Sequence, residues 1–183
     1  MKSGGGKNKG SSFERKVCRI LTKWITGKEH PEIFWRSASS GAKSTMDSIK
    51  GTATDMHGDI MAVNEEGFWF TNKFLIECKF YKDVDIGKFL TGSGKLRDWW
   101  NQACEDGAKA NKIPLLIFKR NGSSIYIMFN SFDCRFFEVC FSESKKWRIE
   151  IRDNCAIYPY QIYLLEDFLD WIDIESLKYK REE

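Results

Sequence analysis

One short apolar segment, residues 74–80 (FLIECKF), constrains the fold of this chain more than any other. Its length and content predict a strand, and the alternation of side chains along a strand puts Glu77 and Lys79 on one face. A buried carboxylate and ammonium need partners, because removing unpaired charges from water is costly. Taken alone, the pair is better explained as a solvated ion pair on a half-exposed sheet.

The hydrophobic patterns on either side of this segment predict an α/β sandwich, in which helices flank a mixed β-sheet. The core elements are expected as a helix at 11–25, strands at 32–37 and 58–63, one or two strands within 68–80 that include 74–80, a helix at 96–110, and strands at 113–120 and 123–129. We expect a turn at 64–67 to lay strand 58–63 beside the next strand, and loops at 37–58 and 83–95. Beyond residue 130 the patterns predict strands at 136–141 and 146–152, an amphipathic helix at 160–172 and a frayed tail at 178–183.

A chain of 183 residues is long enough to bury a core without disulfides. We divide it into a flexible basic arm at 1–10, a core at 11–129, and a C-terminal β/α extension at 130–183 that packs on the core. The six cysteines show no C-x-x-C spacing and are interpreted as free, buried thiols. No membrane span or secretory signal is recognisable, so a cytoplasmic location is the default expectation.

The net charge of +3 hides an asymmetry between the two ends of the chain. Residues 1–50 contain 11 Lys and Arg against 4 Asp and Glu, whereas the remainder contains 18 against 22. A basic front suggests a polyanionic partner, with nucleic acid first. Lys7 and Lys9 in the arm are then expected to contact phosphates without reading sequence. A solvated charged surface is the alternative.

Two further carboxylates are expected close to Glu77 and Lys79. Asp59 stands at the start of strand 58–63, and Glu14 lies at the edge of the apolar face of helix 11–25. Such a cluster suits a hard divalent cation such as Mg²⁺, which is usually held by one or two carboxylates together with substrate phosphates. Beside that cation, Lys79 would orient or deprotonate a water molecule, or would stabilise the charge that develops on phosphorus.

The ordered motifs of the chain resemble the PD-(D/E)XK nuclease superfamily, and within it the archaeal-type Holliday-junction resolvases. GSSFERK is similar to the opening helix motif, GDI to the aspartate motif and IECK to the E-x-K motif, over roughly residues 10–129. WRSASSG resembles the arginine strand with its serine loop, and IPLLIFKR resembles a later strand of the family. One departure is that Gly58 stands where the superfamily motif has proline.

The resemblance implies a restriction-endonuclease-like core of order αβββαβ, and a Mg²⁺-dependent endonuclease, with Mn²⁺ as a substitute. It further implies a homodimer that hydrolyses phosphodiester bonds in four-way DNA junctions, as in recombination and repair. The expected catalytic residues are Glu14, Asp59, Glu77 and Lys79. The expected metal ligands are Asp59, Glu77, Glu14 and the backbone carbonyl of Cys78. The expected DNA contacts are Lys7, Lys9, Arg15, Arg36, Ser37, Ser39, Ser40 and Lys119.

Two other functions remain open from the sequence. One is a restriction- or repair-type nuclease that acts on duplex DNA, and the other is a DNA-binding module whose acidic cluster has no catalytic role. A dead site would tend to lose one of its four central residues, and all four are present in this chain. Additional roles for Asp55, His57 and Gln102 are left undecided.

Overall fold

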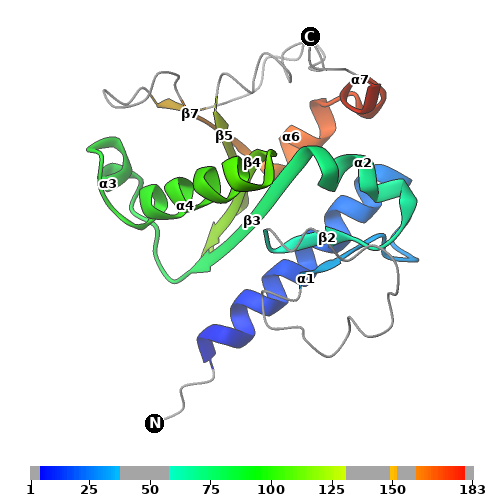
Figure 1. Cartoon of the computed structure of the whole chain (residues 1–183). Helices are drawn as coiled ribbons and strands as arrows, with labels where there is room; N and C mark the ends of the chain where they lie inside the picture. The colour runs from blue at the N-terminus through cyan, green and yellow to red at the C-terminus, as the bar shows by residue number, and fades with distance from the viewer. Residues whose placement is uncertain (1–4, 38–57, 131–148, 152–159, 180–183) are drawn as a thin grey trace.

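Helices cover both faces of one central sheet in this protein (Figure 1). The computed structural model describes residues 5–37, 58–130, 149–151 and 160–179. The helices are α1 (Gly5–Thr26), α2 (Glu65–Lys73), α3 (Ile86–Leu90), α4 (Lys95–Ala110), α6 (Leu165–Trp171) and α7 (Ile174–Tyr179). The strands are β1 (Phe34–Arg36), β2 (Ile60–Ala62), β3 (Phe74–Tyr81), β4 (Ile113–Arg120), β5 (Ile125–Asn130), β6 (Ile149–Ile151) and β7 (Tyr160–Leu164).

The sheet has the strand order β3-β4-β5-β7-β6, and β1 pairs with β2 in a separate antiparallel ribbon. β3 and β4 are parallel, whereas the remaining pairs of the larger sheet are antiparallel. The sheet is therefore mixed, as predicted, and it is consistent with a restriction-endonuclease-like core. The predicted hairpin at Asn121-Gly122 is also confirmed, since β4 and β5 pair across it and Gly122 has φ +70°.

Helices α1 and α6 pack on one face of the sheet, and α4 packs on the other. Phe13 of α1 packs on Phe80 of β3 with ring centroids 5.7 Å apart, and Phe168 of α6 packs on Phe129 of β5 at 5.3 Å. The strand register places Phe80 and Phe129 on the same face. On the opposite face, Trp100 of α4 contacts Tyr160 of β7 at 5.7 Å.

Helix α1 starts earlier than predicted, at Gly5, so residues 5–10 of the expected flexible arm are helical. Nucleating a helix is costly but extending one is not, and the buried residues from Phe13 onward anchor the nucleus. Lys9 then reaches the β4–β5 turn, where its Nζ lies 3.5 Å from Oδ1 of Asn121.

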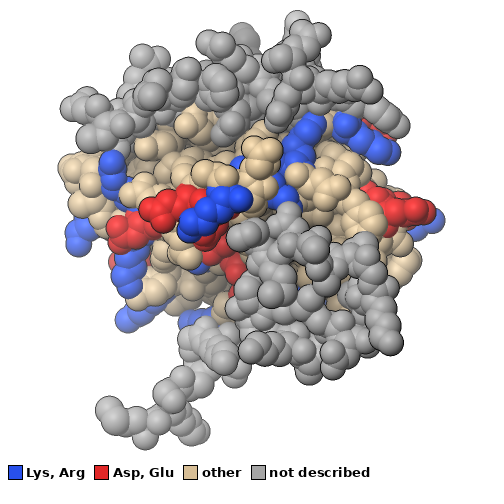
Figure 2. Space-filling view, viewed as in Figure 1, with Lys and Arg blue, Asp and Glu red and all other residues tan. Residues whose placement is uncertain are grey.

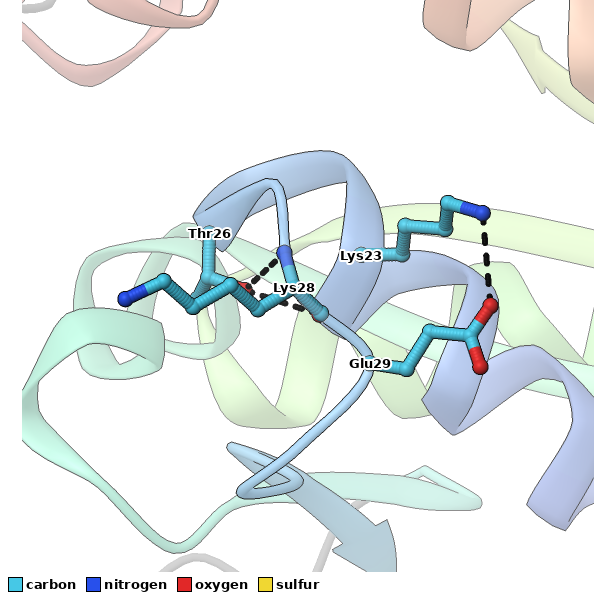
Figure 3. Close-up of polar contacts among 4 residues, drawn as sticks. All are labelled: Lys23, Thr26, Lys28 and Glu29. Carbon is cyan, nitrogen blue, oxygen red and sulfur yellow. Dashed lines mark hydrogen bonds and ion pairs between the residues drawn. The ribbon is translucent and has the colours of Figure 1, made fainter.

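The C-terminal end of α1 is closed by short-range polar contacts (Figure 3). Gly27 takes φ +70° and donates its N–H to the carbonyl of Lys23 at 2.8 Å, as a left-handed helix end requires. The hydroxyl of Thr26 accepts the N–H of Lys28 at 3.1 Å, and Lys23 pairs with Glu29 at 3.3 Å. These contacts turn the chain toward β1.

The predicted turn at 64–67 is wrong, and so is a strand at 68–73, because α2 occupies residues 65–73. Asn64 is an N-cap whose side chain accepts the N–H of Glu66 at 3.0 Å, and the acidic residues that follow favour a helix start. Phe70 of α2 is buried in the core, where its ring meets Phe74 at 5.0 Å. β2 and β3 are therefore joined by a helix and not by a hairpin.

Three further predictions need correction toward the C-terminus and in the second loop. Residues 160–164, expected as the start of a helix, form β7, because four buried side chains fill the gap between β5 and β6. The loop at 83–95 contains α3, capped by Asp85. Helix α7 extends to Tyr179, inside the expected tail.

The other predictions for residues beyond 130 concern two strands and the boundary of the core. The strand at 146–152 is present as β6, and the predicted strand at 136–141 lies outside the described residues. The boundary predicted between core and extension falls at the end of β5, and β7 and α6 complete the same sheet and core. No helix in the described part of the chain is long and apolar enough to span a membrane.

Candidate active site

The charged pair that interrupts the apolar segment lies on β3, the edge strand of the large sheet. Glu77 is 6% exposed and its Oε1 forms an ion pair with Nζ of Lys79, which is half-buried. The two side chains share a face, as predicted, but the surrounding burial does not fit a solvated pair. The strand thus holds a desolvated carboxylate whose ammonium partner lies two residues away.

Asp59 is attached to the open edge of β3 by two hydrogen bonds. Its backbone N–H donates to the carbonyl of Ile76 at 2.8 Å, and its Oδ2 accepts the backbone N–H of Cys78 at 2.8 Å. In a strand, the N–H and C=O of one residue point to the same side. Cys78 lies between Glu77 and Lys79 in the sequence. Its carbonyl therefore faces the same edge of β3 as the Asp59 carboxylate.

Gly58 allows this close approach. It has φ +82°, and a Cβ added to it would lie 2.9 Å from the carbonyl oxygen of Ile76. Proline fixes φ near −65° and is incompatible with this backbone. The departure from the superfamily motif is thus explained by the conformation that brings Asp59 onto β3.

Glu14 and Arg36 form a second ion pair, between α1 and β1. Glu14 is 8% exposed, and its Oε2 is bonded to Nε of Arg36. The arginine predicted to contact DNA is directed instead, through this nitrogen, to a carboxylate of the cluster. This ion pair was not predicted from the sequence, although Glu14 and Arg36 both stand in motifs that resemble those of the superfamily.

The pKa of Asp59 shows that Glu77 and Glu14 both lie within electrostatic range of its carboxyl group. Burial, followed by the charge of Glu77 and, to a smaller extent, that of Glu14, raises the pKa of Asp59 to about 7. The Cys78 N–H and the Lys79 ammonium oppose this rise. The site therefore concentrates negative charge around a carboxyl that is partly protonated at neutral pH.

The pKa of Lys79 is also raised, which for a lysine favours the charged form. Burial lowers the pKa of Lys79, but the hydrogen bond and charge of Glu77, with the charge of Asp59, outweigh burial and raise it above 10.5. The ammonium is therefore retained at neutral pH in this structure. A positive, hydrogen-bond-donating Lys79 suits charge stabilisation better than proton abstraction.

Comparison with known proteins decides the family. A family model described as "Phage putative PDDEXK endonuclease" matches residues 5–179, nearly the whole chain. The chain belongs to this family of phage PDDEXK endonucleases. It is also 31% identical over 130 residues to Protein D14 of Escherichia phage T5, which covers 69% of this chain and 72% of D14. No solved structure matches the chain significantly.

The PDDEXK family confirms the superfamily that the motifs resembled, and it identifies the chain as a nuclease. The matched region continues to residue 179, so it includes β7, α6 and α7 as well as the predicted core. The comparisons do not extend to the archaeal-type junction resolvases.

PDDEXK nucleases generally use divalent metal ions, and the residues at the edge of β3 fit such an ion. The described residues contain no group of three His, Cys, Asp or Glu side chains placed to hold a metal together. The oxygen atoms that could bind the ion are those of the Asp59 and Glu77 carboxylates and the main-chain carbonyl of Cys78. The raised pKa of Asp59 reflects burial first and then the negative charge of Glu77, and a bound cation would neutralise that charge. Oxygen donors of this kind suit a hard cation.

The other predicted site residues lie outside the Asp59–Glu77–Lys79 cluster or outside the described part of the structure. Ser37 is 1% exposed, and its hydroxyl donates to the carbonyl of Gly58 at 2.6 Å, so it supports the turn before Asp59. Arg15 is exposed on α1, and Gln102 is exposed on α4. The side chain of Lys7, and Ser39, Ser40, Asp55 and His57, lie outside the described part of the structure.

The predicted cysteine chemistry is confirmed for the described residues. Cys18 and Cys78 are free and buried, and Cys104 is free and half-buried. Burial, with the charges of Glu32 and Glu14, raises the pKa of the Cys18 thiol to about 12. Burial also raises the pKa of Cys78, so its contribution to the site is through the main chain.

Proposed function

We propose that this phage PDDEXK nuclease is a Mg²⁺-dependent DNA endonuclease that selects branched DNA, with the four-way junction as its preferred substrate. The observation that carries the proposal is the bond between the Asp59 carboxylate and the Cys78 N–H, beside the Glu77–Lys79 pair. This bond joins the aspartate motif to the E-x-K motif at one point of the sheet edge. Mn²⁺ is expected to substitute for Mg²⁺.

Asp59, Glu77 and the carbonyl of Cys78 are the proposed ligands of the cation. When bound, Mg²⁺ supplies neutralisation of the phosphate charge and activation of a water molecule for attack. The protein contributes position: Asp59 is fixed by hydrogen bonds to β3, and Glu77 extends from the same strand. Hydrolysis forms a bond between the water oxygen and phosphorus, breaks one P–O ester bond, and leaves one hydroxyl end and one phosphate end.

Lys79 is proposed to donate hydrogen bonds to the reacting phosphate, or to orient the attacking water, and not to remove a proton. Its raised pKa keeps it protonated, and the charge that develops on the phosphate oxygens needs a cation in a water-poor site. Between substrates, Glu77 holds the ammonium in place.

Glu14 is proposed to assist cation binding by adding a negative charge from α1 to the carboxylates of Asp59 and Glu77. Its effect on the pKa of Asp59 places it within electrostatic range, and Arg36 fixes its carboxylate. Arg36 acts in this proposal as a positioning residue. A direct DNA contact by Arg36 is not needed.

The preference for a four-way junction and the homodimer are supported by the ordered motifs, which resemble junction resolvases over residues 10–129. Cutting two opposite strands requires two sites related by a two-fold axis, and two-fold dimers are the commonest assemblies. A restriction- or repair-type nuclease acting on duplex DNA is the second candidate, and the phage endonuclease family accommodates both.

A cleavage assay distinguishes these substrates. Labelled four-way junction, flap and linear duplex of the same sequence are incubated with the protein in Mg²⁺, Mn²⁺ or EDTA. We expect cleavage in both metals, fastest on the junction, and none in EDTA. Faster cutting of linear duplex would contradict junction selectivity and favour the restriction- or repair-type nuclease. No cleavage of any DNA would refute the proposed function. Light scattering at micromolar protein tests the dimer.

A further inference from the structure

A basic hollow lies beside β3, on the opposite face of that strand from Glu77 and Lys79. It has a volume of about 350 Å³ and is formed where residues 9–19 of α1 pass the C-terminal ends of β3 and β4. Four cationic side chains line it: Lys9, Lys16, Arg19 and Lys119. None of the described residues that line it is Asp or Glu. Phe80, which follows Lys79 in the chain, forms its floor.

The floor of the hollow holds two of the ammonium groups in place. Nζ of Lys9 lies 5.7 Å from the centroid of the Phe80 ring, and Nζ of Lys119 lies 5.9 Å from it. Phe13 supports the same ring from α1. Cation–π contact attracts an ammonium without consuming its hydrogen-bond donors. Lys119 therefore keeps its donors for an anion in the hollow, and Lys9 keeps those that its 3.5 Å hydrogen bond to Asn121 does not use.

The neighbouring groove along α1 has a different charge. Its volume is about 570 Å³, and it lies between residues 16–24 of α1, the β4–β5 hairpin near its turn, and α6. It shares Lys16 and Lys119 with the basic hollow, but Glu166 and Asp170 also line it. These carboxylates repel phosphates, so the strongly basic surface ends along α1 before Lys23 is reached.

The face covered by α4 is also mixed in charge. Figure 2 shows acidic and basic side chains lying next to one another over α4, whose sequence carries Asp98, Glu105 and Asp106 among its lysines and arginine. Lys109 of this helix is paired with Asp106 at 3.1 Å. A polyanion gains less from such a surface than from the hollow.

We propose that the basic hollow binds backbone phosphates of the DNA substrate, and that the bound DNA follows residues 9–19 of α1 and stops short of α6. The proposal rests on the proposed function in taking DNA as the ligand. The ligand chemistry is a phosphodiester, and sequence plays no part, since lysine and arginine contacts to phosphate carry no base information. Lys16 and Arg19 are assigned roles here that the motifs did not give them.

The test is a salt titration of DNA affinity by fluorescence anisotropy, in EDTA so that no cleavage occurs. The pocket variant is Lys16→Gln/Lys119→Gln. The matched control is Lys23→Gln/Lys28→Gln, which removes the same charge at the other end of α1, where Lys23 is paired with Glu29 (Figure 3). Each phosphate contact contributes about 0.9 to the slope of log affinity against log salt on duplex DNA. We expect the slope to fall by about 1.8 in the pocket variant and to stay unchanged in the control.

Three results would overturn the proposal. One is equal slopes for wild type and the pocket variant. Another is an equal loss of slope in the control, which would assign the effect to general surface charge. The third is binding of inorganic phosphate by wild type that the pocket variant loses while the DNA slopes coincide, which would make the hollow a small-anion site.

Two additional measurements separate folding and catalysis from the proposed contact. Lys16→Arg/Lys119→Arg keeps both charges, and we expect it to retain the wild-type slope, with folding checked by circular dichroism. If wild type cuts no DNA in Mg²⁺, the proposed function fails, but the difference in slopes still decides whether the hollow binds DNA. In an active enzyme, the pocket variant is expected to raise KM and leave kcat unchanged.

Discussion

The backbone N–H of Cys78 donates a hydrogen bond to Oδ2 of Asp59 at 2.8 Å, across 19 positions of sequence. The bond takes up one carboxylate oxygen and leaves the other available to a ligand. Because the donor belongs to the edge strand β3, the position of Asp59 depends on the sheet and not on a bound metal. The acidic site is therefore largely preformed. What remains unfavourable in it is the burial of several carboxylates close together.

Gly58→Ala is expected to destabilise the protein and reduce cleavage. The new Cβ would lie 2.9 Å from the Ile76 carbonyl oxygen, closer than Cβ contacts normally come, at φ +82°. The matched control is Gly122→Ala, where φ is +70° but no atom lies within 4 Å of the added Cβ. Both variants pay for the left-handed backbone, on the order of 1 kcal/mol.

The difference between these two variants isolates the contact with β3. We expect urea denaturation to show a larger loss of unfolding free energy for Gly58→Ala, and cleavage to fall more than DNA binding. Equal losses in stability and activity for the two alanine variants would show that the close approach of residue 58 to β3 is unimportant.

Asp59→Asn is expected to stabilise the metal-free protein more at pH 8 than at pH 5. The pKa of Asp59 is raised from 3.8 to about 7, so the folded state retains a proton that the unfolded state has lost between these values. Wild-type stability therefore falls as pH rises through this range and levels off above about pH 7. Asparagine removes this loss, which amounts to roughly 2–3 kcal/mol between pH 5 and pH 8.

The measurement is chemical denaturation in EDTA at both pH values. Asp98→Asn, which removes an exposed carboxyl from α4, controls for the loss of one negative charge. A stability difference between Asp59→Asn and wild type that is the same at both pH values would contradict the raised pKa.

Mg²⁺ is expected to raise the melting temperature of wild type at pH 8, and not that of Asp59→Asn or Glu77→Gln. A ligand that binds only the folded state adds about 2.7 kcal/mol at 100 times its Kd. This readout is independent of cleavage. A melting temperature that Mg²⁺ raises equally in all three proteins would place the cation elsewhere.

The Glu14–Arg36 pair is expected to be strongly coupled. Its side chains are only 11% and 15% exposed, so removing one partner leaves a buried charge, at a cost of about 3–5 kcal/mol. In a double-mutant cycle of Glu14→Gln and Arg36→Gln, we expect the double variant to lose much less than the sum of the single losses. The exposed pair Lys109–Asp106 is the control, with an expected coupling below about 1 kcal/mol. Additive losses for Glu14 and Arg36 would mean that the two do not act as a pair.

The sequence predicted those features that depend on local pattern. The alternation in residues 74–80 predicted β3, the helical spacing from Phe13 predicted most of α1, and Asn121-Gly122 predicted the β4–β5 hairpin. The proximity of Asp59 to Glu77 was also predicted, but for a wrong reason. A hairpin was expected to join them, whereas the chain passes through α2 and returns along β3.

The features that were missed depend on tertiary context. Residues 68–70 (FWF) suit a strand by composition, and only the Asn64 cap reveals a helix start. Residues 160–164 have helical spacing, yet the vacant position beside β5 makes them a strand. The Glu14–Arg36 pair and the basic hollow bring together residues far apart in the sequence. Gly58 was noticed as a departure from a motif, and its reason is a positive φ that no local pattern indicates.

The most direct test of the central claim is the cleavage rate of Asp59→Asn and Glu77→Gln in Mg²⁺, measured beside their DNA affinity in EDTA. Both substitutions keep the shape of the side chain and remove a proposed metal ligand. We expect cleavage to fall by at least about 100-fold, since one lost charge-stabilising group costs on the order of that factor. Affinity should stay near the wild-type value, because lysine and arginine contacts to phosphate supply most of the binding. Cleavage at the wild-type rate by either variant would contradict the account.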